Sequence, residues 1–141
     1  MNETHIRRAI ELAAEAGEHG NRPFGAVVVG SDGTVLAEGR NEVASSNDVT
    51  AHAELVAIRA ASSAEDATMY ASGEPCPMCS AAMVWAGITR IVFSASEPEF
   101  SKILVGGPRF SLRCAEVVAA ADVDITVEGP VLENEALAVM R

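Results

Sequence analysis

The stretch EPCPMC, residues 74–79, carries two of the chain's three cysteines in the spacing Cys-x-x-Cys. It leads into PMCSAAMVWAG, residues 77–87, an apolar helical pattern in which Pro77 suits the first turn and Gly87 suits the end. Free backbone N–H groups at a helix start favour a thiolate, which is the form that binds a metal. The stretch therefore predicts a helix that begins with two metal ligands, although a redox pair or a structural metal clip has the same spacing.

A second polar segment, TAHAEL at residues 50–55, opens another helical pattern and contains His52 and Glu54. One imidazole and two thiolates, from His52, Cys76 and Cys79, form a donor set that suits zinc. Glu54 is two residues beyond His52 and does not share its helix face, so we expect a proton carrier rather than a fourth ligand. Three protein ligands leave one coordination position open, which is typical of catalytic zinc. The pattern H-x-E followed by P-C-x-x-C is the signature of the zinc deaminases.

A closed structural zinc site is the alternative, and it requires a fourth protein ligand. Cys114 is the remaining cysteine, and His5 and His19 are the remaining histidines. Cys114 lies in an apolar helical pattern, which is typical of a buried small residue. A Cys76–Cys79 redox pair would leave the HAE segment unexplained.

Outward from these two segments, strand and helix patterns alternate. Because a hairpin opens the chain and strand–helix alternation follows, we predict an α/β fold with three layers, α-β-α, in which a five-stranded mixed sheet has helices on both faces. We expect one domain over residues 1–141. The predicted helices cover residues 3–17, 51–61, 77–87, 112–121 and 132–140, the strands cover 23–30, 35–43, 67–73, 90–96 and 123–129, and irregular segments cover 44–50 and 97–110.

The overall charge argues against a nucleic-acid partner. The net charge is −10 and the sequence pI is about 4.6, whereas binding to phosphate backbones depends on lysine and arginine. A small-molecule substrate is therefore favoured. The charged N-terminal segment lacks the layout of a signal peptide, and no apolar run is long enough to span a membrane. Together with the odd number of cysteines, this predicts a reduced cytoplasmic location.

Three segments of the chain resemble the cytidine deaminase-like superfamily, and within it the guanine deaminase and tRNA adenosine deaminase branch. They are RPFGAVVV at 22–29, AEGRNEVASSNDVTAHAELVAIRAA at 37–61 and EPCPMCSAAMVWAGI at 74–88. The resemblance implies a homodimer or larger oligomer, one Zn²⁺ per subunit and loss of an exocyclic amine as ammonia through attack by zinc-bound hydroxide. It also implies that His52, Cys76 and Cys79 bind zinc and that Glu54 shuttles protons.

The same resemblance implies a set of substrate contacts. Asn41 would hydrogen-bond the base, Phe24 and Trp85 would be aromatic pocket residues, and the backbone N–H of Ala53 would face the substrate. From sequence pattern alone, Asn41 also fits an ordinary turn residue, and the two aromatic residues fit a core. Glu99 is either a solvated loop acid or an acceptor for the edge of a base.

The segment SEPEFSKILVGGPRFS, residues 96–111, departs from the guanine deaminase pattern, which has an acidic stretch here and an aromatic residue in its C-terminal tail. The basic surface of tRNA deaminases is also missing. We therefore expect a deaminase of guanine or a related oxo-amino ring such as isoguanine or ammeline. A cytosine-type base deaminase is the alternative. A tRNA adenosine deaminase and a non-catalytic structural zinc module remain further alternatives.

Overall fold

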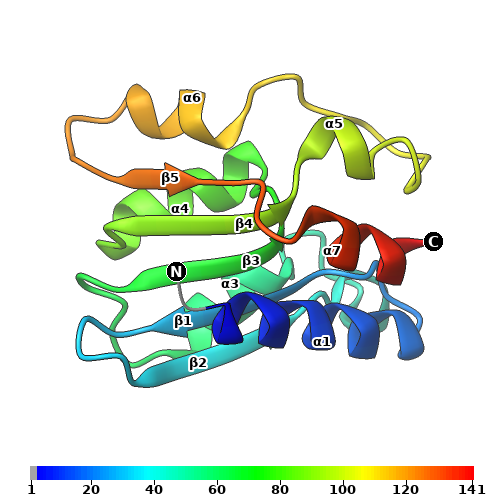
Figure 1. The fold of residues 1–141 in the computed structure, drawn as a ribbon, viewed down its shortest axis with the longest axis horizontal. Coiled ribbons are helices and arrows are strands. Elements are labelled where there is room, and N and C mark those ends of the chain that lie inside the picture. Colours follow the sequence, from blue (N-terminus) through cyan, green and yellow to red (C-terminus); the bar gives the residue numbers. More distant parts are fainter. Residues whose placement is uncertain (1–2) are drawn as a thin grey trace.

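A five-stranded mixed sheet forms the centre of the computed structural model, which describes residues 3–141. The strands lie in the order β2-β1-β3-β4-β5 (Figure 1). β1 is antiparallel to both of its neighbours, whereas β3, β4 and β5 run parallel to one another. The predicted mixed sheet is thereby confirmed. The strands are β1 (Gly25–Val29), β2 (Val35–Arg40), β3 (Thr68–Gly73), β4 (Arg90–Ala95) and β5 (Thr126–Glu128).

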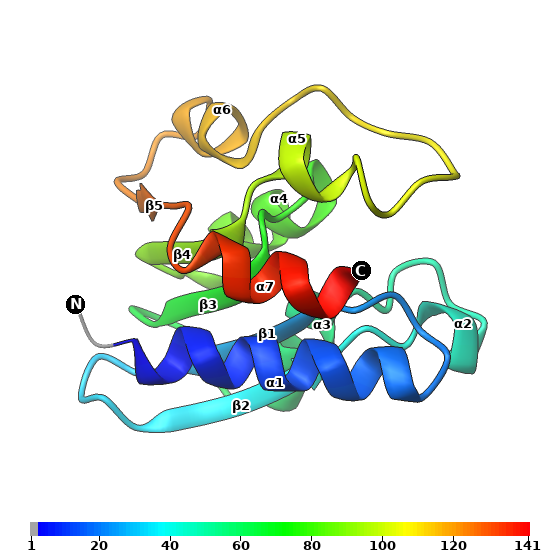
Figure 2. The same ribbon diagram turned by 45° about the vertical axis from the view of Figure 1, so that its right-hand side comes forward.

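Helices cover both faces of this sheet, as the alternating pattern predicts. α1 (Thr4–Glu18) and α7 (Glu133–Met140) pack against one face. α3 (Ala53–Ala60), α4 (Pro77–Ala86) and α6 (Cys114–Ala119) pack against the other (Figures 1 and 2). The three layers bring the helices that follow β2 and β3 next to each other.

The inner strand β1, which lies between β2 and β3, shows why a continuous apolar run is required. Ala26 and Val28 enter the core beneath α3 and α4, whereas Val27 and Val29 enter the core beneath α1. Successive side chains of a strand point to opposite faces, so a strand covered on both faces must be apolar at every position. All five residues of β1 are buried.

Two short helices occupy segments that were predicted to be irregular. α5 (Glu97–Phe100) lies within 97–110, where Pro98 is in its first turn and the carbonyl of Ser96 accepts the N–H of Phe100 at 2.9 Å. α2 (Val43–Ser46) begins at the last residue of the predicted strand 35–43, because β2 ends at Arg40, and it continues into 44–50; Asn47 follows it in the left-handed conformation, with φ of 53°. Single helical turns of this length carry no amphipathic period, which is why the sequence pattern did not reveal them.

Close helix–strand packing at Gly39 sets the position of α3. A Cβ atom at Gly39 would overlap the carbonyl oxygen of Ala53, in the first turn of α3. The absence of a side chain in β2 therefore lets the backbone of α3 approach the sheet. Within residues 3–141, no helix is long and apolar enough to cross a bilayer.

Candidate metal centre and its pocket

Two helix starts meet at the candidate metal centre. His52 is the residue immediately before α3, and Cys76 is the residue immediately before α4; both have extended backbone conformations. Pro77 occupies the first turn of α4, as predicted, and the N–H of Cys79 donates to the Cys76 sulfur at 3.5 Å. This contact places both cysteines on the same side of the first turn. The starts of α3 and α4 thus bring an imidazole and two thiols close together.

The spacing of the three side chains fits a tetrahedral metal ion. The Nδ1 atom of His52 lies 3.6 Å from the Cys76 sulfur and 3.5 Å from the Cys79 sulfur. Zinc bonds of about 2.1 Å to nitrogen and about 2.3 Å to sulfur, at a tetrahedral angle, separate the two donor atoms by about 3.6 Å. All three donor atoms lie within 4.8 Å of one another. The donor set and its spacing therefore suit zinc.

No fourth residue joins this group in the part of the chain from residue 3 onward. Cys114 is buried in the core cluster beneath α4 and α6, His5 packs against Tyr70 with ring centroids 5.1 Å apart, and His19 contacts the Glu15 carbonyl. A structural zinc site is normally filled by four protein ligands, whereas a catalytic site keeps one position for water or substrate. The geometry thus favours the catalytic arrangement over the closed one.

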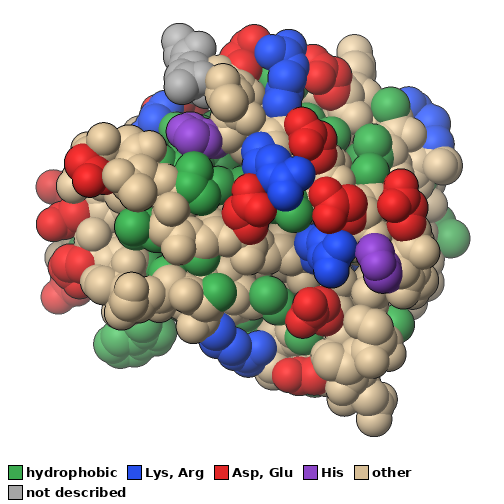
Figure 3. Space-filling model, turned by 90° about the horizontal axis from the view of Figure 1, so that it is seen from below, with side chains coloured by type: hydrophobic (Ala, Val, Ile, Leu, Met, Phe, Trp, Pro, Cys, Tyr) green, Lys and Arg blue, Asp and Glu red, His purple; other side chains and the backbone are tan. Residues whose placement is uncertain are grey.

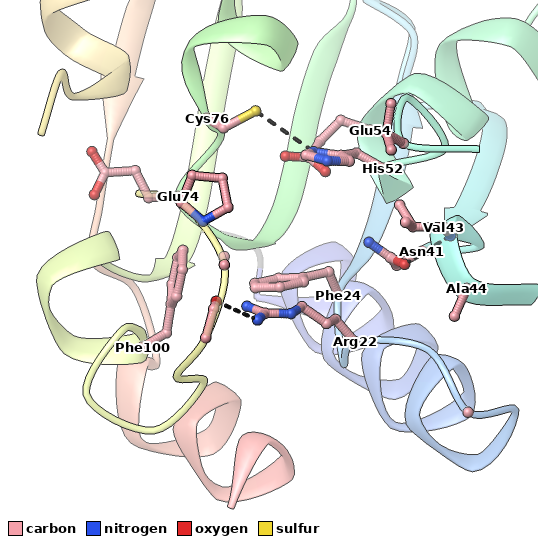
Figure 4. Close-up of a pocket in the computed structure, with 16 residues that line it drawn as sticks. Arg22, Phe24, Asn41, Val43, Ala44, His52, Glu54, Glu74, Cys76 and Phe100 are labelled. Carbon is pink, nitrogen blue, oxygen red and sulfur yellow. Dashed lines mark hydrogen bonds between the residues drawn. The ribbon is translucent and has the colours of Figure 1, made fainter. Parts of the chain in front are cut away.

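Glu54 lies buried beside these donors, with 7% of its surface exposed. Its burial, followed by the negative charge of Cys76, raises the pKa of the Glu54 carboxyl to about 7. A carboxyl with a pKa near neutrality can both take up and release a proton at physiological pH. Figure 4 shows its carboxylate next to the His52 ring. The position agrees with the predicted proton carrier, which does not belong to the ligand group.

The three donor groups shift one another's pKa. Hydrogen bonding from Cys79, together with His52, lowers the pKa of the Cys76 thiol to about 4. The same contact with Cys76, together with burial, raises the pKa of Cys79. The hydrogen bond with Cys76 raises the pKa of His52. A divalent cation would supply the positive charge that two adjacent thiolates require.

A cavity of about 530 Å³ opens over this centre. His52, Glu54 and Cys76 lie along one side of it (Figure 4). Phe24 and Phe100 form an aromatic wall, with an edge-to-face contact and ring centroids 5.1 Å apart. Such a size and mixture of apolar walls with a few polar groups are typical of small-molecule sites.

Asn41 presents hydrogen-bond donors to this cavity. Its side-chain oxygen accepts the backbone N–H of Val43 at 3.1 Å, which fixes the orientation of the amide. The amide nitrogen then points toward the cavity (Figure 4). Asn41 is 5% exposed, so an acceptor on a ligand would be a natural partner for its N–H groups. The backbone N–H of Ala53 begins α3 and has no acceptor within the helix, although Ala53 itself does not line the cavity.

Neither Trp85 nor Glu99 is among the residues that line this cavity. Trp85 follows Cys79 by six residues in α4, which is about 240° around the helix, and its side chain is 89% exposed. The Glu99 carboxylate instead pairs with Lys102 at 2.8 Å on the surface. The cavity therefore gives no support for the expected contacts of these two side chains with a base, and these contacts stay predictions.

Several cavity residues escaped the sequence analysis. Arg22, Phe100 and the segment 106–108 line the cavity. Glu74 also borders the cavity, but its carboxylate points away from it (Figure 4) and binds Arg113. The one indication of Arg22 in the sequence was that it is the single basic residue of RPFGAVVV. Its contact with the Gly106 carbonyl was not predictable, because the two residues are 84 positions apart.

Basic and acidic side chains are mixed on the face formed by α1 and β2 (Figure 3). Arg8 contacts Glu11, Glu15 and Glu38, and Arg40 contacts Glu15. Each guanidinium on this face is thus offset by carboxylates. A phosphate backbone would have to displace these ion pairs, so this face is a poor surface for nucleic acid.

Comparisons with known proteins agree with this geometry. A family model described as the cytidine and deoxycytidylate deaminase zinc-binding region matches residues 1–95. A probable cytosine deaminase of Schizosaccharomyces pombe is 34% identical over 140 residues, covering 94% of this chain and 86% of that protein. The guanine deaminase of Bacillus subtilis is 48% identical over 103 residues, covering 68% of this chain and 65% of that protein.

The three-dimensional structure is also similar to that of a solved deaminase. A solved tRNA:A34 deaminase structure superimposes with a TM-score of 0.80 and 29% sequence identity, over 98% of this chain and 99% of that one. The similar proteins thus act on different amino-bearing rings, while the fold is common to them.

Proposed function

Since this chain belongs to the cytidine and deoxycytidylate deaminase family, whose members are zinc-dependent hydrolytic deaminases, we propose that it removes the exocyclic amine of a guanine-type base as ammonia. Whatever the identity of the ring, the chain is a deaminase of a nucleobase or nucleoside. The observation that carries the proposal is the three-residue donor group with the buried Glu54 beside it, opening into a cavity of about 530 Å³. Isoguanine and ammeline share the oxo-amino ring of guanine and belong to the same substrate class.

The metal would be held by His52, Cys76 and Cys79. Zinc bound there would supply Lewis-acid chemistry that lowers the pKa of water to about 7. Glu54 takes one proton from the attacking water and passes it to the ring nitrogen, then takes the second proton from the added hydroxyl and passes it to the amine, which leaves as ammonia. Burial, which raises the pKa of the Glu54 carboxyl, favours its uptake of these protons.

The ring is held by the walls of the cavity. The Asn41 amide donates hydrogen bonds to an acceptor on the ring, and Phe24 and Phe100 contact its faces or edges. The N–H of Ala53, at the start of α3, is a further donor for a carbonyl oxygen of the substrate. An oxo-amino ring offers the acceptors that these donors need.

A cytosine-type base is the second candidate. The observation that favours it is the match to the probable cytosine deaminase, which extends over 94% of this chain, whereas the match to the guanine deaminase covers 68%. A tRNA substrate is less favoured because the chain has a net charge of −10. Salt-dependent binding of a tRNA at low ionic strength would support it instead.

One experiment separates these substrates. The zinc-loaded protein is incubated with guanine, isoguanine, ammeline, cytosine, guanosine, cytidine and a tRNA, and released ammonia is measured. We expect ammonia from guanine or a related oxo-amino base. Release from nucleosides but from no free base would contradict the choice of a free base. Zinc-loaded protein that releases no ammonia from any of them would contradict the proposed substrate class.

A further inference from the structure

Arg22 differs from the other arginines in its charge environment. The chain has 20 acidic and 10 basic residues, so carboxylates are plentiful. Within residues 3–141, only Arg22 and the C-terminal Arg141 have no carboxylate oxygen within 4.0 Å. The arginines that do have such a partner are Arg7, Arg8, Arg40, Arg59, Arg90, Arg109 and Arg113.

The contacts of Arg22 use one of its three nitrogen atoms. Nη2 donates to the carbonyl oxygens of Gly106 at 2.9 Å and Val105 at 3.3 Å. Nε and Nη1 have no protein acceptor in the described part of the chain. A guanidinium has five N–H donors in a planar fork, and this fork matches a carboxylate or a phosphate. Arg22 therefore keeps its charge and most of its donors for a ligand.

The position of Arg22 places that charge in the same cavity as the metal centre. Arg22 lines the cavity, and in Figure 4 it lies on the far side of Phe24 from His52 and Cys76. Gly106 and Gly107 form the neighbouring rim in left-handed conformations, with φ of 97° and 79°. A ligand whose ring reaches the metal centre would thus extend a substituent past Phe24 to the guanidinium.

The cavity has room for such a substituent. Its volume of about 530 Å³ is within the range of pockets that hold drug-sized ligands, which are larger than a bare heterocycle. The other ionisable side chains lining it are His52, Glu54, Glu74 and Cys76, and the Glu74 carboxylate points away toward Arg113. Among the residues that the structure describes, Arg22 is consequently the one permanent cation lining the cavity, and no carboxylate lies within 4.0 Å of it.

We propose that Arg22 is a specificity-determining residue that binds an anionic substituent, a phosphate or a carboxylate, on the ring that is deaminated. This inference rests on the proposed function and adds that, among amino-substituted rings, those that carry a negative charge at the end remote from the reacting amine are preferred over their neutral counterparts. A polynucleotide is the less favoured source of phosphate, because the chain has a net charge of −10.

The test compares matched substrates that differ in the anion alone. Guanosine is paired with guanosine monophosphate, and 1-methylcytosine with 1-(carboxymethyl)cytosine, so that the two pairs separate phosphate from carboxylate and both anions lie remote from the reacting amine. The kcat/KM ratio of the anionic to the neutral member is measured for the zinc-loaded wild type, Arg22→Gln and Arg22→Lys. Glutamine retains an N–H donor for the Gly106 carbonyl but has no charge. Arg109→Gln is the control, since it removes a charge from the loop that Arg22 contacts, while Arg109 pairs with Glu97 outside the cavity.

We expect the wild type to prefer the anionic member of one pair and Arg22→Gln to lower that ratio by about 10-fold to 100-fold. Arg22→Lys should give an intermediate ratio, and Arg109→Gln should leave it within about twofold. A ratio that is unchanged in Arg22→Gln overturns the proposal, because Arg22 then only holds the loop. Equal losses for both members of each pair overturn it for the same reason.

A binding measurement separates this inference from the proposed function. If no compound releases ammonia, titration calorimetry of the zinc-loaded Glu54→Ala protein with guanosine monophosphate and with guanosine decides the role of Arg22. Tighter binding of the monophosphate, lost on adding Arg22→Gln, supports anion binding even where deamination fails. Equal affinity for the two compounds overturns it.

Discussion

The guanidinium of Arg113 is bound to the carboxylate of Glu74, and its Nε lies 2.8 and 3.0 Å from the two oxygens. Glu74 also accepts the backbone N–H of Glu97 at 2.9 Å, and its side chain is 3% exposed. The buried carboxylate of Glu74, the first residue of EPCPMC, therefore contacts both Glu97, which begins α5, and Arg113, which immediately precedes α6. The loops beside the cavity depend on this connection.

Replacing Arg113 by methionine should destabilise the protein, because it leaves the Glu74 carboxylate buried without its cation. Loss of one partner of a fully buried pair costs about 3–5 kcal/mol, and the partial exposure of Arg113, at 40%, reduces our expectation to about 1–3 kcal/mol. Urea unfolding measures the change. The double variant Glu74→Gln/Arg113→Met should recover part of the loss, and equal stabilities of the wild type and Arg113→Met would contradict this role.

Replacing Glu54 by glutamine should abolish turnover while zinc remains bound. Glu54 is placed as the proton carrier and is not a member of the ligand group, so we expect kcat to fall by about 10²–10⁴-fold. Ammonia release and zinc content by mass spectrometry are measured on the same sample. Glu18→Gln, at the exposed end of α1, is the control. Wild-type rates in Glu54→Gln would exclude this assignment.

Replacing Cys79 by serine should remove zinc from the purified protein. A serine hydroxyl is a far weaker zinc donor than a thiolate, and His52 and Cys76 alone provide two ligands. Cys114→Ser is the matched control, because Cys114 is buried but lies outside the ligand group. We expect near-zero zinc per chain in the first variant and unchanged zinc in the second. Equal zinc content in the two variants would argue against the assigned site.

The ion pair between Glu128 and Arg90 should give a pH-dependent contribution to stability. Arg90 donates to both Glu128 oxygens at 2.9 Å and lowers the pKa of that carboxyl below its usual 4.5. A lowered folded-state pKa contributes stability above the unfolded pKa, and this stability is lost as pH falls through the folded pKa.

The change to test is Glu128→Gln. We expect it to cost about 0.5–1 kcal/mol at pH 7, the range for exposed pairs of good geometry. The difference from the wild type should shrink in urea unfolding below about pH 4, because the wild-type carboxyl is then being protonated. A difference that stays constant from pH 7 to pH 3 would rule out the ion pair as its source.

Replacing Gly39 by alanine should destabilise the protein, because the added Cβ would overlap the Ala53 backbone at the start of α3. Overpacking of this kind costs about 1–3 kcal/mol. Gly17→Ala is the matched control: it lies inside α1, where the nearest atom to an added Cβ is 3.8 Å away, so we expect no loss of stability. Comparable destabilisation in the two variants would show that α3 tolerates displacement from the sheet.

Much of the fold followed from local pattern. The uniform apolar run in β1, the proline and glycine that bound α4, and the strand–helix alternation gave the sheet and its two helical layers. The short helices α2 and α5 were not found, since one turn has no period to detect. The expected homodimer stays a prediction, and light scattering would test it against twice the chain mass of 14.7 kDa.

The residues of the candidate site were likewise predictable only in part. His52, Glu54, Cys76 and Cys79 were predictable because the chemistry of zinc requires certain residue types at helix starts, and both features are local. The exposed position of Trp85 could not be predicted, because its apolar character gives no indication of which face of α4 is exposed. The pairing of Glu99 with Lys102 could not be predicted from the pattern either, and the expected roles of Trp85 and Glu99 stay predictions.

The candidate metal ligands and the family were predictable from the sequence, because both depend on residue type and on short spacings. The lining of the cavity depends on the tertiary structure, since Arg22, Phe100 and the segment 106–108 meet there from distant parts of the chain. Long-range packing also left Arg22 without a carboxylate partner in an acidic protein. No local pattern encodes that arrangement, because it is a property of the surroundings that folding assembles around the side chain.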